Sequence, residues 1–216
     1  MIEKYFIFEN ITLVIFAYLL GSIPSAVWIG RKYFGKDVRD FGSGNAGATN
    51  TFRVFGKKAG SIVLVLDILK GILAVNLVYL SSNFEQGSEL FINFKMLLGL
   101  FAILGHIFPI FAKFKGGKGV ATLVGIIFSI NPTAALLTIA AFAIFFIAFN
   151  YVSLASVISA FLFPFFMYFV VDYKNEVALF YGIVLWIIIL ITHQKNVQRL
   201  LNQEESKMIL FKKKRS

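Results

Sequence analysis

Residues 120–149 read VATLVGIIFSINPTAALLTIAAFAIFFIAF and contain no Asp, Glu, Lys or Arg. This apolar run is longer than the roughly 20 residues that one helix needs to cross a bilayer. Asn131-Pro132, near its middle, can form either a tight turn between two helices or a kink in one long helix. The choice between them sets the number of membrane spans and the side of the membrane that holds the C-terminus.

The remainder of the 216-residue chain has the same character, with 58% hydrophobic and 15% charged residues. Soluble domains average roughly 45–50% apolar and about 25% charged residues, so a soluble enzyme is disfavoured. No heptad pattern or internal repeat divides the sequence, and we expect one domain over residues 1–216. Apolar windows predict spanning helices near residues 8–30, 61–80, 96–112, 120–131, 133–149, 151–171 and 178–193.

The distribution of charge supports seven spans. With seven, the polar segments 31–60, 113–119 and 194–216 share one side and hold most of the chain's 21 Lys and Arg, whereas acidic residues outnumber Lys on the other side. Because cationic segments stay in the cytoplasm, the N-terminus is expected outside and the C-terminus in the cytoplasm. Merging the fourth and fifth windows would put the cationic tail outside. The sequence therefore predicts an all-α polytopic membrane protein with seven transmembrane helices.

Composition also limits the chemistry. The chain has no Cys and 2 His, which excludes disulfides, Cys-ligated zinc, iron–sulfur clusters and thiol nucleophiles. We expect no metal and no cofactor. The net charge of +10 suits nucleic acid, anionic lipid or phosphorylated substrates, but a cationic face shared with lipid headgroups disfavours nucleic acid. The basic tail at residues 212–215 is predicted to anchor to lipid headgroups.

Residues 42–50, GSGNAGATN, lie in the first cytoplasmic segment and alternate small and polar side chains. Small residues allow backbone N–H groups to converge on an anion, and the nearby Arg39 and Arg53 supply positive charge. The pattern indicates a phosphate-binding loop, and the alternative is a flexible basic linker attracted to anionic lipids. It is not an NTP-binding loop, because Ala48 stands where the phosphate-binding Lys is required.

Residues 113–119, KFKGGKG, again combine Lys with Gly and follow a window that ends in Gly105-His106-Ile107-Phe108-Pro109. A proline there opens or kinks the helix and leaves backbone groups in need of partners. Membrane anchoring could explain the lysines and a tight turn could explain the glycines. Anchoring alone does not require three glycines, so two Gly-rich basic loops on one face favour phosphate binding.

A third polar group follows the last apolar window. If the helix continues past His193, then His193, Asn196 and Arg199 share one face at the membrane surface. A single histidine is usually structural, but this trio on the same side as the two loops is a candidate site.

Two further polar pairs lie inside predicted spans. Asp67 and Lys70 are three residues apart and can pair, either as structural support for the neighbouring loop or as functional groups. Ser153 and Ser156 begin the sixth window and can meet a substrate or bond back to helix carbonyls.

Taken in order, the segments GSGNAGATNTFR, DILKG, GHIFPIFAKFKGGKGVAT and HQKNVQRLLNQEESK closely resemble those of the bacterial acyl-phosphate:glycerol-3-phosphate acyltransferase family. The resemblance implies seven spans in the bacterial cytoplasmic membrane with the motifs facing the cytoplasm. It also implies transfer of a fatty acyl group from acyl phosphate to the 1-hydroxyl of glycerol 3-phosphate. The products would be 1-acyl-glycerol 3-phosphate and phosphate, in the first acylation of phospholipid biosynthesis.

The resemblance further implies roles for the matching residues. Ser43, Arg53 and Lys118 look like ligands of the glycerol-3-phosphate phosphate, a site that Asn45 shapes and to which Lys115 adds charge. His193 and Asn196 resemble residues that orient the glycerol hydroxyls, and together with Ser43 they are the catalytic candidates. Gly116, Gly117 and Gly119 resemble the turn that receives the acyl-phosphate head. The supporting residues would be His106, Asp67, Lys70, Ser153 and Arg199.

One position departs from the family pattern. Gln203 follows RLLN, where we expect many relatives to have Gly, and this leaves the path of the tail beyond Leu201 open.

An acyl phosphate is a mixed anhydride with a good leaving group, so the substrate hydroxyl can attack it directly. The His-x-x-x-x-Asp pair of other glycerol-phosphate acyltransferases is missing, since Phe111 and Gln198 stand five residues after the two histidines. We expect the donor phosphate to accept the hydroxyl proton, with His193 as the competing general base.

Expected partners are glycerol 3-phosphate, fatty acyl phosphate and membrane lipid, and a soluble acyl-phosphate synthase is a candidate docking partner. The main alternative function is a transporter of phosphorylated metabolites. It would need polar residues through the membrane, whereas only Asp67 and Lys70 are charged within the predicted spans. A scaffold for acidic proteins would need no glycine loops.

Overall fold

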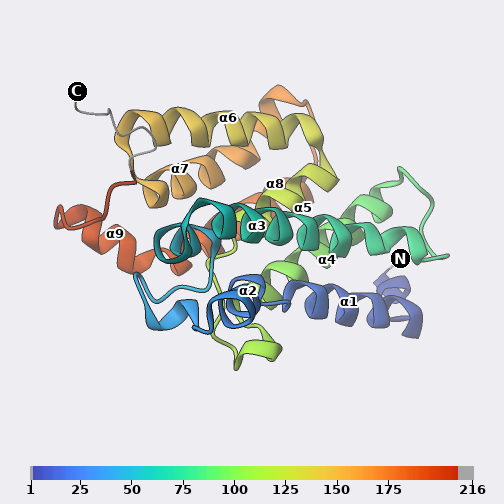
Figure 1. Cartoon of the computed structure of the whole chain (residues 1–216). Coiled ribbons are helices and arrows are strands. Elements are labelled where there is room, and N and C mark those ends of the chain that lie inside the picture. The colour runs from blue at the N-terminus through green and yellow to red at the C-terminus, as the bar shows by residue number, and fades with distance from the viewer. Residues whose placement is uncertain (1, 209–216) are drawn as a thin grey trace. The chain divides into compact units, whose positions relative to one another are not determined.

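The computed structural model describes residues 2–208, and every regular element in that range is helical (Figure 1). The chain forms two compact units that divide after Ala135, so the expectation of a single domain over residues 1–216 stays a prediction. The lipid anchor predicted at residues 212–215 lies outside the described residues. The first unit holds α1 (Phe8–Gly21), α2 (Ser25–Phe34), α3 (Ala48–Asn76), α4 (Glu89–Ile107) and α5 (Val120–Ile130). The second holds most of α6 (Pro132–Phe149), α7 (Val152–Phe165), α8 (Glu176–Thr192) and α9 (Gln194–Leu201).

Glycines allow the helices of the first unit to approach closely. Gly71 of α3 lies against the backbone of Thr122 in α5, and Gly125 of α5 lies against the backbone of Ile68, so a Cβ at either glycine would overlap the partner helix. Gly21 of α1 makes the same kind of contact with the backbone of α4. Because lipid gives no hydrophobic drive for helices to associate, close packing of small residues is what holds such helices together.

Hydrogen bonds fix the two ends of this unit. At one end the Ser81 hydroxyl after α3 donates to Asn10 of α1 over 2.7 Å, and Lys95 of α4 donates to the Ser129 carbonyl of α5 over 3.0 Å. At the other end Arg39 donates to carbonyls beside the second Gly-rich loop. The polar segments 31–60 and 113–119 therefore meet at the same end of the helices, in agreement with their placement on one side by the charge pattern.

Two features of this unit differ from the sequence expectation. Helix α3 begins at Ala48, well before the predicted span at 61–80, and it breaks where Gly56 takes φ 82°. Arg53 therefore stands on the first turns of a helix rather than on a loop. Lys95 lies just before the predicted window at 96–112 and belongs by charge pattern to the polar side opposite the cationic segments, but it is part of α4 and only 9% exposed. Its ammonium lies over the Tyr79 and Phe91 rings.

In the second unit α7 packs against α8. Gly182 of α8 faces Pro164, where a Cβ would come within 2.7 Å of the proline Cβ, and the Phe161 and Trp186 rings contact each other at 5.0 Å. Pro164 lies inside α7 and is followed by a π-helical turn, η5 (Phe166–Val170). A proline removes a backbone hydrogen bond, which explains the local change of helix type.

The described helices match the predicted windows in place but do not settle the count of spans. Four segments are long and apolar enough to cross a membrane, and two bent pairs, α1 with α2 at 41° and α8 with α9 at 64°, raise the number to six. Helix α5, with 11 residues, is shorter than a roughly 30 Å hydrocarbon core requires. The seven-span count and the orientation of the termini stay predictions.

Candidate active site

The side chain of Asn50, in the first turn of α3, organises the segment from residue 41 to residue 47, here called the serine loop. Its Nδ2 lies 3.0 Å from each of the Val38, Phe41 and Asn45 carbonyls, and its Oδ1 accepts from the Ser43 N–H at 2.9 Å. Asn50 is 1% exposed. One buried amide therefore closes the loop that presents Ser43, whose side chain is exposed, and Asn45, which is half-buried.

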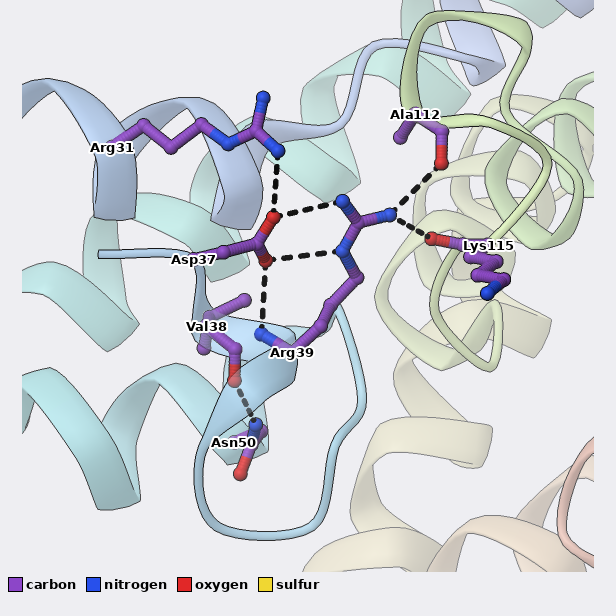
Figure 2. A network of polar contacts seen from close by, with 7 residues as sticks. All are labelled: Arg31, Asp37, Val38, Arg39, Asn50, Ala112 and Lys115. Carbon is purple, nitrogen blue, oxygen red and sulfur yellow. Dashed lines mark hydrogen bonds and ion pairs between the residues drawn. The ribbon is translucent and has the colours of Figure 1, made fainter. Parts of the chain in front are cut away.

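Asp37 and Arg39 connect the serine loop to residues 113–119, here called the lysine loop (Figure 2). Arg39 donates through Nε and Nη2 to the two carboxylate oxygens of Asp37 at 3.0 and 2.8 Å. Its Nη1 donates to the Ala112 and Lys115 carbonyls at 2.8 and 3.1 Å. The hydrogen bonds from Arg39 lower the pKa of Asp37 to about 2, so this ion pair stays charged at neutral pH.

The lysine loop is folded back onto the end of α4. The Gly116 and Gly117 N–H groups donate to the Ile107 and His106 carbonyls at 3.1 and 3.2 Å. A Cβ at Gly117 would overlap Nε2 of His106. These two amides therefore cap α4, and the glycines are required because the loop backbone lies directly on helix atoms. Gly119, with φ 86°, is the N-cap residue that precedes α5.

A buried polar cluster lies beneath the lysine loop. Asp67 and Lys70 pair at 3.0 Å, as their spacing predicts, and Asp67 also accepts from the Ser25 hydroxyl at 3.1 Å. His106 Nδ1 lies 3.1 Å from the Thr122 hydroxyl and 3.8 Å from Asp67. All five side chains are at most 5% exposed. The cluster holds the His106 ring against Gly117, and a supporting role in the reaction for His106, Asp67 and Lys70 stays a prediction.

The predicted phosphate ligands of the first unit differ in exposure. Arg53 and Lys115 are exposed, as is Ser43, while Lys118 is half-buried. All four belong to the serine loop, the lysine loop or the start of α3. Cations at the surface beside loops that hydrogen bonds hold in place can attract an anion without reorganisation of the backbone.

In the second unit, Glu205 joins residues that the sequence grouped only in part. Its Oε1 accepts from the Ser153 hydroxyl at 2.8 Å and from the Asn196 amide at 2.7 Å, and its Oε2 accepts from Arg199 Nε at 2.8 Å. Burial alone would raise the pKa of Glu205, but these hydrogen bonds outweigh it and the net shift is downward. Ser156 donates to the Val152 carbonyl at 2.7 Å, which is the back-bonded alternative.

His193 lies at the bend between α8 and α9. The expected continuous helix is wrong at this point, because the helix axis turns by 64°. His193 is 3% exposed, and its Nδ1 lies 2.8 Å from the Ile189 carbonyl. Since a carbonyl only accepts, Nδ1 carries the hydrogen, and Nε2 of the neutral ring is the basic nitrogen.

Sequence reasoning missed Asp37, Asn50 and Glu205, each of which holds a loop in place. Asn50 closes the motif GSGNAGATN, so its position at the start of a helix was the available signal. Nothing in the sequence distinguishes the buried Glu205 from the exposed Glu204. Within residues 2–208 no group of three or more His, Asp or Glu side chains could hold a metal ion.

The family model for glycerol-3-phosphate acyltransferases matches residues 11–203. This chain belongs to that family. The glycerol-3-phosphate acyltransferase of Enterococcus faecalis is 45% identical over 92% of this chain and 91% of its own length. That of Fusobacterium nucleatum is 41% identical over 90% and 95%.

A comparison with solved structures supports the same family assignment. The integral membrane glycerol 3-phosphate acyltransferase PlsY, in its glycerol 3-phosphate form, matches with a TM-score of 0.82 and 38% identity over 92% of this chain and 95% of that chain. The same enzyme has been solved in a lysophosphatidic acid form, which matches with a TM-score of 0.79. The chain described here is thus an acyltransferase and a multi-pass integral membrane protein.

Proposed function

We propose that this acyltransferase uses a fatty acyl phosphate as donor and transfers the acyl group to the 1-hydroxyl of glycerol 3-phosphate. The new ester bond joins the hydroxyl oxygen to the acyl carbon, and the bond from that carbon to the donor phosphate breaks. Phosphate leaves with the bonding electrons, and the other product is 1-acyl-glycerol 3-phosphate. The observation that carries the proposal is that Arg39, just before the serine loop, donates to the Ala112 and Lys115 carbonyls, so that two glycine-containing segments meet at one end of the helices.

The reaction requires two anions to approach. Two unit charges about 4 Å apart repel by about 4 kcal/mol at an effective dielectric constant near 20, and each phosphate carries up to about two charges. Arg53, Lys115 and Lys118 would offset this repulsion, with Ser43 as a further ligand of the glycerol-3-phosphate phosphate and Asn45 shaping the loop. Gly116, Gly117 and Gly119 would let the acyl-phosphate head approach the lysine loop closely.

A second group of residues would position the acceptor hydroxyl. We assign this role to His193 and Asn196, with Ser153 and Arg199 supporting Asn196 through Glu205. Correct orientation of hydroxyl and carbonyl can lower a barrier by up to roughly 7–11 kcal/mol. The donor phosphate would take the hydroxyl proton, with Nε2 of His193 as the competing base.

The His193→Gln variant separates these two bases. Gln retains a polar side chain near the acceptor but cannot take a proton. If the donor phosphate is the base, the variant keeps measurable turnover at saturating substrate. Complete loss of turnover, with glycerol 3-phosphate binding unchanged, would make His193 the base.

We further propose one membrane domain over residues 1–216 with seven spans, an external N-terminus and a cytoplasmic C-terminus, in the bacterial cytoplasmic membrane. The cationic segments on one side support this orientation. The chain has no Cys, so single cysteines can be introduced and labelled from either side. Cysteines at Lys36 and Lys195 should be protected from an impermeant reagent in whole cells, and one at Glu85 should be labelled; the reverse pattern would refute the orientation.

The donor is tested with purified enzyme, glycerol 3-phosphate and either palmitoyl phosphate or palmitoyl-CoA. Lysophosphatidate formed only from the acyl phosphate supports the proposal, whereas product formed from the thioester refutes it. Lys118→Gln should raise KM for glycerol 3-phosphate about tenfold or more, as expected for loss of a charged hydrogen bond. The matched control Lys113→Gln removes the same charge from the exposed start of the same loop and should change KM little.

If the donor is an acyl phosphate, a soluble synthase must supply it, and the cationic cytoplasmic face is where we expect such an enzyme to dock. Co-sedimentation of that synthase with vesicles containing this protein, and its loss at high salt, would test the contact.

A further inference from the structure

We propose that Asp37 and Arg39 are a positioning pair that sets the spacing between the serine loop and the lysine loop, and thereby the affinity for glycerol 3-phosphate. The inference rests on the proposed function for the identity of the loops as phosphate ligands. It adds residues that bind neither substrate but act through the loops that do.

The hydrogen bonds of Arg39 leave it little freedom. Nε and Nη2 form a fork on the Asp37 carboxylate, while Nη1 reaches two carbonyls, of Ala112 and Lys115, far away in the sequence (Figure 2). Only 18% of the Arg39 side chain and 12% of the Asp37 side chain are exposed. A planar guanidinium held by a carboxylate on two nitrogens has a fixed direction for the third, so it sets where the lysine-loop backbone lies.

Asp37, the other member of the pair, is also held in place by the backbone. Asp37 Oδ1 also accepts from the backbone N–H of Arg39 at 3.0 Å, which caps the short helix η2 (Val38–Asp40). The carbonyl of Val38, in that same turn, accepts from Asn50 Nδ2 at 3.0 Å. Hydrogen bonds and the backbone of η2 therefore connect Asn50 and the serine loop, through Asp37 and Arg39, to the Lys115 carbonyl.

Arg39 is a poor candidate for a direct phosphate ligand. Its three donor nitrogens already have acceptors, and moving them to a phosphate would leave the Asp37 carboxylate half-buried without its main partner. Because Asp37 neutralises the charge of Arg39, Arg39 can lie beside the lysine loop without adding a net positive charge there. Arg31 completes this pairing from α2 but is 63% exposed and contacts Asp37 through a single 3.0 Å bond.

Lysine cannot replace Arg39 in this geometry. One ammonium can bond to the carboxylate or to the carbonyls of the lysine loop, but its position is not fixed by a bidentate fork. Arg39→Lys should therefore keep the charge and lose the positioning, which separates a positioning role from simple electrostatic attraction of substrate.

The test compares Arg39→Gln, Arg39→Lys and Arg31→Gln in the full-length protein in nanodiscs. Isothermal titration with glycerol 3-phosphate should show affinity reduced about tenfold or more for both Arg39 variants and within about twofold of the wild type for Arg31→Gln. Arg31→Gln removes the same charge from the same carboxylate, so it is the matched control. Wild-type affinity in Arg39→Lys, or equal affinities in Arg39→Gln and Arg31→Gln, would overturn the inference.

A second measurement reports the spacing itself. In the cysteine-free chain, spin labels at Lys36 and Phe111, both exposed, should give a narrow distance distribution in the wild type and in Arg31→Gln. The distribution should broaden in Arg39→Lys, even if Arg39→Gln does not fold. An unchanged distribution in a folded Arg39 variant would overturn the inference.

The outcomes for the two proposals are distinguishable. If the wild type binds glycerol 3-phosphate but does not use acyl phosphate, the proposed donor is wrong, and the binding comparison still decides the role of Arg39. If the wild type uses acyl phosphate and Arg39→Lys binds normally, only the positioning role is wrong.

Discussion

Replacement of Asn50 by Ala should disorder the serine loop while leaving the transmembrane helices intact. Asn50 Nδ2 lies within hydrogen-bond distance of three carbonyls, and its Oδ1 accepts from the Ser43 N–H. An amide nitrogen has two hydrogens, so the side chain makes about three full hydrogen bonds at one time. At about 0.5–1.5 kcal/mol each, their loss costs about 1.5–4.5 kcal/mol.

The loss should lower the free energy of local loop opening, because the bonds join Asn50 only to residues 38–45. Each 1.4 kcal/mol changes an opening equilibrium about tenfold. Hydrogen exchange at the Ser43 and Gly44 amides should therefore become about 10 to 1,000 times faster in Asn50→Ala. Because Ser43 is a proposed phosphate ligand, KM for glycerol 3-phosphate should rise as well.

Two companion variants sharpen the test. Asn50→Asp keeps the shape and the acceptor for the Ser43 amide but turns a charged oxygen toward three carbonyls, so it should be at least as damaging. Thr49→Ala, at the neighbouring half-buried position, should leave exchange and KM close to the wild type. Unchanged exchange at Ser43 in Asn50→Ala would refute the assignment of this side chain as the organiser of the loop.

Four further outcomes follow from the same geometry. Gly117→Ala should cost about 1–3 kcal/mol of stability in thermal unfolding, because the new Cβ overlaps the buried ring of His106; an unaltered midpoint would show that the ring can move. Glu205→Gln should destabilise the protein by about 2 kcal/mol, since the new NH₂ group must face a hydrogen-bond donor in place of an acceptor oxygen, and Glu205→Ala should be no milder. Gln203→Gly should stabilise the protein by up to about 1 kcal/mol, because Gln203 has φ 60°, and a destabilised variant would contradict this reading. The folded pKa of Asp37, about 2, lies below its usual value of 3.8, so its contribution to stability is present above about pH 4 and fades as the pH falls toward 2; the difference in midpoint between wild type and Asp37→Asn should be constant from pH 5 to 8 and shrink in acid.

Local sequence patterns predicted the side-chain contacts that depend only on residue spacing along one helix. The Asp67–Lys70 pair follows from a separation of three residues, and its 3.0 Å contact confirms that expectation. Clusters of Gly, Lys, Ser and Asn in the sequence indicated where both loops of the first unit lie. The Gln203 position was singled out because a Gly was expected there, and its φ of 60° is a backbone conformation that favours Gly.

Contacts between distant segments were not predictable in the same way. The overlap of Gly117 with His106 depends on how the lysine loop folds back onto α4, which neither segment encodes alone. The apolar window predicted at 178–193 ends where α8 ends, but the sequence does not indicate the 64° bend between α8 and α9. The shared face of His193, Asn196 and Arg199 was predicted for a straight helix, and the bend removes that condition. What gathers Asn196 and Arg199 is Glu205, which lies beyond the last turn of α9.

A recurring feature of the first unit is a buried or half-buried side chain that holds the backbone next to an exposed cation or hydroxyl. Asn50 does this for Ser43, and Arg39 does it for Lys115. A loop already held by such bonds does not have to be ordered when substrate binds, so less of the binding free energy is lost to conformational entropy. For an enzyme that must bring two phosphates together, this matters because the attraction of surface cations alone is weakened by water and salt. The fixed backbone, rather than the number of lysines, is therefore what should distinguish a phosphate site from a basic membrane anchor.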